Sequence, residues 1–272
     1  MIPDTATSLL TAGSGAIVGL VLGLVGGGGS ILAVPLLVYL VGVSPPHVAI
    51  GTSALAVSAS AFGNLLPHAR AGNVKWRCAA VFAAAGVAGA LLGAEFAKAL
   101  NGDKLLVLFG LVMVAVGLAM FRKRDGTGNS DVRLTTHTAR ELLPSLLGIG
   151  FAVGLLSGFF GIGGGFLIVP GLILATGMPM TSAIGTSLVA VSAFGAATGA
   201  SYAASGMIDW PIAVLFVLGG VGGGILGVAL GRILARRKRA LNLVFATIVV
   251  AAGIYVLARG ISALSGGLIN PA

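Results

Sequence analysis

The sequence predicts an all-α, polytopic membrane protein built from two repeats that are inserted in opposite orientations. Of its 272 residues, 57% are hydrophobic and only 8% are charged, whereas a soluble domain carries about 25% charged residues. The hydrophobic residues gather in runs of about 20, the length of a helix that crosses a bilayer. Because so few charged side chains cannot cover a surface in water, a soluble fold is excluded.

The net charge of +9 does not indicate a nucleic-acid partner. Lys and Arg occur in short clusters beside the apolar runs, which is typical of the residues that orient a protein in a membrane. We therefore expect membrane lipid around the chain and no nucleic acid. A homodimer is compatible with the sequence.

Two halves of the chain match each other in order. Residues 19–35 read GLVLGLVGGGGSILAVP, and residues 154–170 read GLLSGFFGIGGGFLIVP. The motif AIGTS follows at 49–53 and again at 183–187. Further matches pair Gly72, Trp76, Gly86, Gly89 and Gly93 with Gly206, Trp210, Gly220, Gly223 and Gly227. We infer a duplication, with repeat 1 at 9–121, a polar linker at 122–143 and repeat 2 at 144–258.

Each repeat holds one long apolar stretch, 9–42 or 145–177, followed by three ordinary runs. The ordinary runs are 48–68, 77–99, 104–121, 183–205, 211–231 and 240–258. A straight helix of about 33 residues would be roughly 50 Å long, too long for a bilayer core of about 30 Å. Glycines interrupt each long stretch near its middle. We expect Gly-broken helical hairpins that cross twice or re-enter, giving eight apolar segments and up to ten crossings.

The basic residues predict the orientation of the segments. Three loops are rich in them: Arg70/Lys75/Arg77, Arg122/Lys123/Arg124 with Arg133 and Arg140, and Arg232/Arg236/Arg237/Lys238/Arg239. All three can be cytoplasmic only if each long stretch returns the chain to its starting side. Repeat 2 is then inverted relative to repeat 1, the linker is cytoplasmic and both termini are periplasmic, in a bacterial inner membrane. No Lys or Arg precedes Arg70, so the first apolar run lacks the basic region of a signal peptide and is expected in the mature protein.

The two glycine clusters are the main candidate site. Inverted-repeat transporters bind substrate near the bilayer midplane, at broken helices. Half-helices that start near Ile31 and Phe166 would direct their N-termini at this region, and helix N-termini favour anions. The predicted substrate-binding glycines and serine are Gly26, Gly27, Gly28, Gly29, Ser30, Gly161, Gly163, Gly164 and Gly165. The alternative is that the glycines only permit close helix packing, which is the interpretation favoured for Gly86, Gly89 and Gly93.

Polar side chains near these clusters extend the candidate set. Thr52, Ser53, Thr186 and Ser187 offer hydroxyl donors to an oxyanion, or alternatively bond to nearby backbone carbonyls. Secondary candidates are Ser58, Asn64, Ser192 and Glu95. Glu95 is the only acid within an apolar run, where it could carry protons or pair with Lys98. No catalytic set, phosphate-binding loop or metal-ligand cluster is evident, so we expect no enzyme activity, no cofactor and no metal.

The duplicated segment G-x-x-x-G-x-x-G-x-G-G-[SG]-x-[LI]-x-V-P, followed by A-I-G-T-S, resembles the TauE/SafE sulfite exporter family, also called the TSUP permeases. The resemblance covers nearly the whole chain and implies transport of a small sulfur-containing anion such as sulfite, sulfoacetate or another organosulfonate. We expect a transporter that works by alternating access. Export is the expected direction, because the negative cell interior favours the exit of an anion by roughly 2.3 kcal/mol per 100 mV. The alternatives are a passive anion channel, a proton-coupled uptake permease and an accessory membrane subunit.

Overall fold

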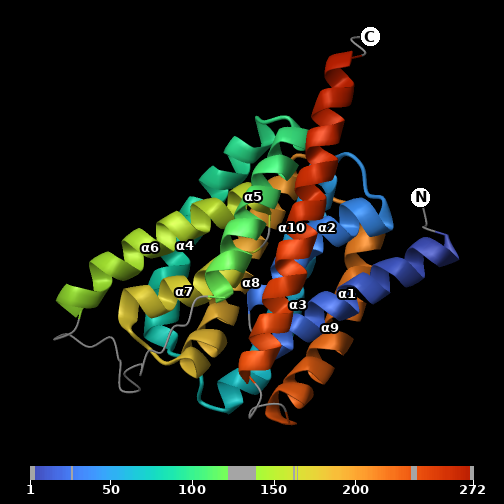
Figure 1. Ribbon diagram of the computed structural model, residues 1–272. Helices are drawn as coiled ribbons and strands as arrows, with labels where there is room; N and C mark the ends of the chain where they lie inside the picture. The colour runs from blue at the N-terminus through green and yellow to red at the C-terminus, as the bar shows by residue number, and fades with distance from the viewer. Residues whose placement is uncertain are drawn as a thin grey trace.

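The computed structural model describes residues 4–25, 27–121, 139–161, 163, 165–233 and 238–269, and Figure 1 shows their arrangement. The first half comprises α1 (Thr5–Val25), the 3-10 segment η1 (Gly27–Leu32), α2 (Ala33–Pro35), the π-helical segment η2 (Leu36–Val41), α3 (Pro46–Arg70), α4 (Trp76–Lys98) and α5 (Gly102–Phe121). The second half comprises α6 (Ala139–Phe160), α7 (Gly165–Thr176), α8 (Met180–Ala204), α9 (Trp210–Ile233) and α10 (Lys238–Ile269).

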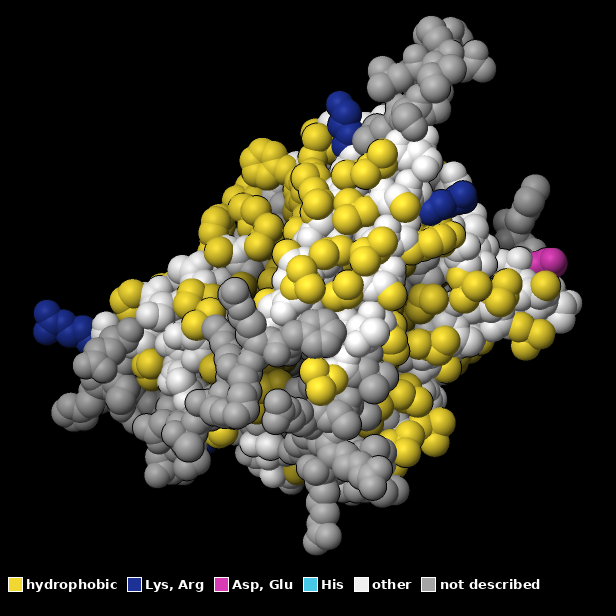
Figure 2. Space-filling view, viewed as in Figure 1, with side chains coloured by type: hydrophobic (Ala, Val, Ile, Leu, Met, Phe, Trp, Pro, Cys, Tyr) yellow, Lys and Arg dark blue, Asp and Glu magenta, His cyan; other side chains and the backbone are white. Residues whose placement is uncertain are grey.

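The all-α polytopic membrane fold is confirmed. Within the described ranges, eight helices are long and apolar enough to cross a membrane, and two shorter apolar segments cover 28–41 and 165–176. Figure 2 shows hydrophobic side chains spread along the side of the bundle, while the few charged side chains visible in this view lie toward its ends. An apolar flank with polar ends is the surface that a bilayer requires.

Each long apolar stretch folds as a helix followed by a short limb that packs back on it. α6 contacts α7, and α1 contacts η1 and η2. The 12 residues of α7 span only about 18 Å, so this limb is too short to cross a core of about 30 Å. The second stretch therefore has the dimensions of a re-entrant hairpin.

The two return limbs differ from each other in helix type. The second is regular α-helix from Gly165, one residue before the expected start. In the first, the 3-10 segment runs through Leu32 and the α-helix covers only Ala33–Pro35. The half-helix expected near Ile31 is present as a helical limb over 28–41, but it begins earlier and is α-helical only over Ala33–Pro35. η1 begins in consecutive glycines, and a Cβ at Gly29 would lie 2.6 Å from backbone atoms of Val18 and Leu22 in α1.

The helix ends fall into two groups at opposite ends of the bundle (Figure 1). One end holds the α3–α4 and α7–α8 junctions, the end of α9 and the starts of α6 and α10. The other end holds the α4–α5 and α8–α9 junctions, the start of α1 and the end of α10. The hairpin that begins with α1 starts and finishes at the second end, and the hairpin that begins with α6 starts and finishes at the first.

The helices pack in matching pairs drawn from the two halves. α1 lies along α9, and α6 lies along α4, while α3 packs against α8 and α5 pairs with α10. Glycines bring the first two pairs into backbone contact. A Cβ at Gly19 would collide with the Gly220 backbone, and one at Gly154 would collide with the Gly86 backbone. Each hairpin is thus held by a helix from the other half of the chain.

The packing interpretation of the stripe on α4 is confirmed. A Cβ at Gly86 would collide with the Phe194 ring, and Cβ atoms at Gly89 and Gly93 would collide with backbone oxygens of Phe151 and Leu155 in α6. Small residues at this spacing allow two membrane helices to approach closely.

Two helices extend past the predicted segment boundaries. α6 begins at Ala139, inside the stretch 122–143 expected to be linker, because Ala139, Arg140 and Glu141 are good helix formers. Residues 122–138 lie outside the described residues. α10 continues to Ile269, beyond the apolar run that ends at 258.

Candidate functional site

The second hairpin turns through two glycines in the left-handed region, Gly161 with φ +65° and Gly163 with φ +63°. Side chains at such φ values are strained, so glycine is favoured. A Cβ at Gly161 would collide with Ile50 of α3. A Cβ at Gly163 would lie 3.2 Å from Val57 of α3 and 3.4 Å from Val191 of α8. The turn therefore lies against α3 and α8, the two most buried long helices among the described residues.

Ser53 ties α3 to this turn. Its buried hydroxyl lies 2.9 Å from the Ile50 carbonyl oxygen and 3.1 Å from the Gly161 carbonyl oxygen, so its single proton is shared between them. The matching Ser187 donates to the Ile184 carbonyl at 2.8 Å. In this conformation both hydroxyls donate to carbonyls, as in the alternative interpretation of the motif. Binding of an anion would require each hydroxyl to exchange its carbonyl for the anion.

The first glycine cluster lies in η1, where Gly28, Gly29 and Ser30 are buried. η1 contacts both α7 and α8, so the structure brings the two broken segments together. Gly27 is the first residue of η1. Gly26 and Gly164 lie outside the described residues.

Gly165 starts α7 and is buried. The first backbone N–H groups of a helix have no partner within it, and they carry partial positive charge. The start of α7 therefore presents donors beside the Gly161–Gly163 turn, without a charged side chain.

Thr52 and Thr186 have a role that the sequence did not reveal. The Thr52 hydroxyl oxygen accepts the backbone N–H of Asp209 at 3.0 Å, and the Thr186 hydroxyl oxygen accepts that of Lys75, also at 3.0 Å. Asp209 and Lys75 immediately precede α9 and α4. Each threonine therefore holds the loop before a helix of the opposite half.

The glycine before each threonine fits the same contact. A Cβ at Gly51 would lie 2.5 Å from the Met207 carbonyl oxygen, and one at Gly185 would lie 2.7 Å from the Asn73 carbonyl oxygen. We call each Gly-Thr pair with its bound loop a clasp. The first clasp joins Gly51 and Thr52 to 207–209, and the second joins Gly185 and Thr186 to 73–75.

Three of the secondary candidates lie along α3 and α8. Ser58 donates to the Ser192 backbone carbonyl at 2.6 Å, which ties α3 to α8. Ser192 donates to the Leu188 carbonyl at 2.8 Å within α8. Asn64 lies against Gly224 of α9, and its buried Nδ2 has no hydrogen-bond acceptor among the described residues.

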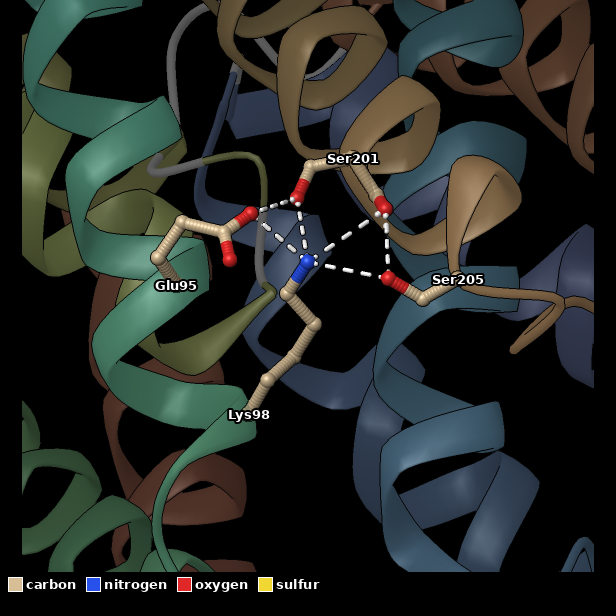
Figure 3. A network of polar contacts seen from close by, with 4 residues as sticks. All are labelled: Glu95, Lys98, Ser201 and Ser205. Carbon is tan, nitrogen blue, oxygen red and sulfur yellow. Dashed lines mark hydrogen bonds and ion pairs between the residues drawn. The ribbon is translucent and has the colours of Figure 1, made fainter.

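Glu95 lies apart from the glycine breaks, in the last turn of α4. Its side chain is 64% exposed and forms an ion pair of 2.6 Å with Lys98, as the sequence allowed. Figure 3 shows that Ser201 of α8 and Ser205, the residue after α8, complete a polar network with this pair. The i, i+4 spacing of these two serines places both on one face of α8 and was the available sequence signal.

Groups of three or more His, Cys, Asp or Glu side chains that could hold a metal ion are absent from the described part of the chain.

Proline and glycine occur at the ends of the helices that carry the site. Pro46 opens α3, where a missing N–H costs nothing. Left-handed Gly72 and Gly206 follow the ends of α3 and α8 at matching positions.

Comparison with known proteins places this architecture in a family. The model of the TauE/SafE sulfite exporter family matches residues 11–256. A probable membrane transporter protein of Xylella fastidiosa (strain 9a5c) is 49% identical over 256 residues, which is 94% of this chain and 97% of that protein. The probable membrane transporter protein YunE of Bacillus subtilis (strain 168) is 31% identical over 235 residues, 80% of this chain and 86% of that protein. No solved structure gives a significant match. The chain belongs to the TauE/SafE sulfite exporter family of membrane transporters.

Proposed function

We propose that the protein is a secondary transporter that exports a small sulfur-containing oxyanion, such as sulfite, sulfoacetate or another organosulfonate, by alternating access. The observation that carries the proposal is the meeting of two glycine-broken limbs, η1 and α7, beside the packed pair α3 and α8. Irregular backbone at membrane depth is tolerated where it is buried in protein or lines a polar cavity.

The proposed site binds the anion through backbone N–H groups and hydroxyls. The N-terminus of α7 and the left-handed Gly161–Gly163 turn supply donors on one side, and η1 supplies the other. Such donors stabilise negative charge without placing a cation in the membrane. Ser53 and Ser187 would reorient from their carbonyl partners to the anion.

The orientation of the chain follows from its basic residues. Arg70, Lys75, Arg77 and Arg140 belong to the α3–α4 junction and the start of α6, which lie at one end of the bundle (Figure 1). We assign this end to the cytoplasm, in a bacterial inner membrane, with the linker inside and both termini in the periplasm. The two halves then form inverted repeats, and the hairpins enter the membrane from opposite sides.

The clasps connect this architecture to alternating access. Each clasp joins a helix of one half to a loop of the other. Movement of one repeat against the other would therefore strain first one clasp and then the other. An inverted pair has the same contacts available at either end, which suits rocking about a central site.

Counterflow in proteoliposomes tests the proposal. Vesicles preloaded with unlabelled sulfite should take up labelled sulfite transiently and with saturation, and competition by sulfoacetate, thiosulfate, sulfate and taurine would rank the substrates. Unsaturable single-channel currents would replace the carrier with a channel. Absence of flux for every anion in the panel would favour an accessory role instead.

A further inference from the structure

The network at the ends of α4 and α8 has the donor arrangement of an oxyanion site. The Lys98 ammonium donates to Glu95 Oε1 at 2.6 Å, and to the hydroxyls of Ser201 and Ser205 at 3.0 Å each. The Ser201 hydroxyl in turn donates to the same Glu95 Oε1 at 2.8 Å. One carboxylate oxygen therefore receives two donors, an ammonium and a hydroxyl, from two different helices (Figure 3).

The hydrogen-bond directions show that the Lys98 ammonium and the Ser201 hydroxyl both point at one negatively charged acceptor, the Glu95 carboxylate. The Ser205 hydroxyl donates its proton to the Ser201 carbonyl oxygen at 3.1 Å, so it can only accept from Lys98. The Ser201 hydroxyl accepts a hydrogen bond from Lys98 and donates one to the Glu95 carboxylate. An oxygen of a sulfite or sulfonate group accepts charge-assisted hydrogen bonds as a carboxylate oxygen does.

Burial distinguishes the two charged residues. The Lys98 side chain is 14% exposed, whereas the Glu95 side chain is 64% exposed. The cation is thus fixed between α4 and α8, and the anion that neutralises it sits on the outer side. Loss of the carboxylate from this position would leave the ammonium and the Ser201 hydroxyl facing the space that it occupied.

The network also adjoins the first clasp. The Lys98 ammonium lies 5.8 Å from the centre of the Tyr202 ring, and Tyr202 packs against Gly51, next to Thr52. The Tyr202 hydroxyl is fully buried and has no hydrogen-bond partner among the described residues. Polar groups therefore continue from the bundle end toward the helix that contacts the Gly161 turn.

We propose that Lys98 and Ser201 form an oxyanion-binding station at this end of the transport path, and that the Glu95 carboxylate occupies it as a built-in substitute for the substrate. The inference rests on the proposed function for its place in transport. An anion arriving from the central site exchanges with the carboxylate at Lys98, and the return of the carboxylate then releases the anion. The station takes the same class of ligand as the central site, a small sulfite or sulfonate group.

Binding of methanesulfonate to the detergent-purified full chain tests the station, because this probe is a monoanion with no titration near neutral pH. Calorimetric titration at low, fixed ionic strength compares wild type with Glu95→Gln, and with Glu95→Gln combined with Lys98→Gln. Asp103→Asn is the matched control, since it also removes one negative charge from this end of the bundle, in the first turn of α5. Thermal melting of each variant checks folding.

Glu95→Gln is expected to bind methanesulfonate roughly tenfold more tightly than wild type at this station, about the effect of one charge-assisted hydrogen bond. The gain should vanish when Lys98→Gln is added, and it should be absent in Asp103→Asn. Unchanged or weaker binding in folded Glu95→Gln would overturn the inference, as would a gain that survives Lys98→Gln or that Asp103→Asn reproduces. Counterflow by wild type, measured in parallel, tests the proposed function separately. If wild type transports but Glu95→Gln shows no gain in binding, only the station is overturned. If Glu95→Gln binds more tightly but wild type does not transport, the station stands and its role in transport is overturned.

Discussion

The two halves of the chain share a framework and differ at its ends. The two clasps are near copies, with Thr52 and Thr186 each 3.0 Å from the backbone nitrogen that they hold. The network at the end of α4 has no such copy. The matching positions of Glu95, Lys98, Ser201 and Ser205 in the other half are Ala229, Arg232, Pro67 and Ala71.

The duplicated clasps hold the two repeats together, whereas the Glu95–Lys98 network makes the two ends of the bundle unequal. In the proposed alternating-access cycle, duplicated contacts would stabilise the inward- and outward-facing states equally, whereas a contact present at one end would change their relative populations. The Glu95–Lys98 network is such a contact, because it ties α4 of the first half to α8 of the second. Substitutions in the duplicated contacts should therefore have matching effects in the two halves, whereas substitutions in the Glu95–Lys98 network should affect one end alone.

The glycine breaks should give the largest effect. Gly163→Leu combines a strained φ of +63° with a side chain forced between Val57 and Val191. Displacement at a site of transport should lower counterflow by about a hundredfold or more, with membrane insertion unchanged. Gly28→Leu, at the matching position of the first hairpin, should behave in the same way.

Gly177 provides the matched control for this experiment. It has a φ of +69°, but a Cβ there would meet nothing within 4 Å. Gly177→Leu should therefore insert and retain most of its flux. If flux is unchanged in both Gly28→Leu and Gly163→Leu, the breaks have no part in transport.

The paired glycine stripes should come next, and they should respond equally in the two halves. Gly19→Ala and Gly154→Ala each direct a methyl group into a facing glycine backbone. We expect each to lower the free energy of unfolding in detergent by about 3 kcal/mol, the upper part of the usual range for overpacking.

Each stripe has a control in the same helix. A Cβ at Gly13 in α1 or Gly148 in α6 meets nothing within 4 Å. Gly13→Ala and Gly148→Ala should be neutral or stabilising by up to about 1 kcal/mol, because Ala favours helix over Gly. Equal destabilisation by the stripe variants and their controls would contradict the close approach of α1 to α9 and of α6 to α4.

The clasps should give a smaller but symmetric effect. Thr52→Val and Thr186→Val keep the side-chain shape and remove the acceptor for one backbone N–H. Each should lower the free energy of unfolding by about 1–2 kcal/mol, since an N–H loses its partner. Thr247→Val is the control, because the exposed Thr247 hydroxyl only donates to the Leu243 carbonyl in its own helix. A loss at one clasp without a comparable loss at the other would break the symmetry of the framework.

Local features of the fold were accessible from sequence because their signals are local. Runs of apolar residues predicted the helices, and the run expected at 77–99 became α4 at Trp76–Lys98. The glycine clusters predicted where the long stretches turn. The 3-10 and π segments of the first hairpin were not predicted, since apolar periodicity does not distinguish helix types at this length.

The partners of the site residues were not accessible, because they lie in the opposite half. Thr52 was expected to donate to an anion or to a nearby carbonyl, and its additional role as acceptor for the N–H of Asp209, 157 residues away, was not predicted. The i, i+4 spacing of Ser201 and Ser205 was their one sequence signal, and it did not identify their partner Lys98, which lies in the other half. A duplicated sequence shows that two units match, but it does not show that each unit completes its contacts on the other.

The opposite insertion of the two halves is the central claim, and site-directed labelling tests it most directly. Cys78 is buried in α4, and a Cys78→Ala background leaves single cysteines introduced by Lys75→Cys or Asp209→Cys as the targets. A membrane-impermeant maleimide applied to intact cells should label the protein at position 209 and reach position 75 only after the membrane is opened. Labelling of both positions from the same side would contradict the inverted arrangement and the proposed transport path built on it.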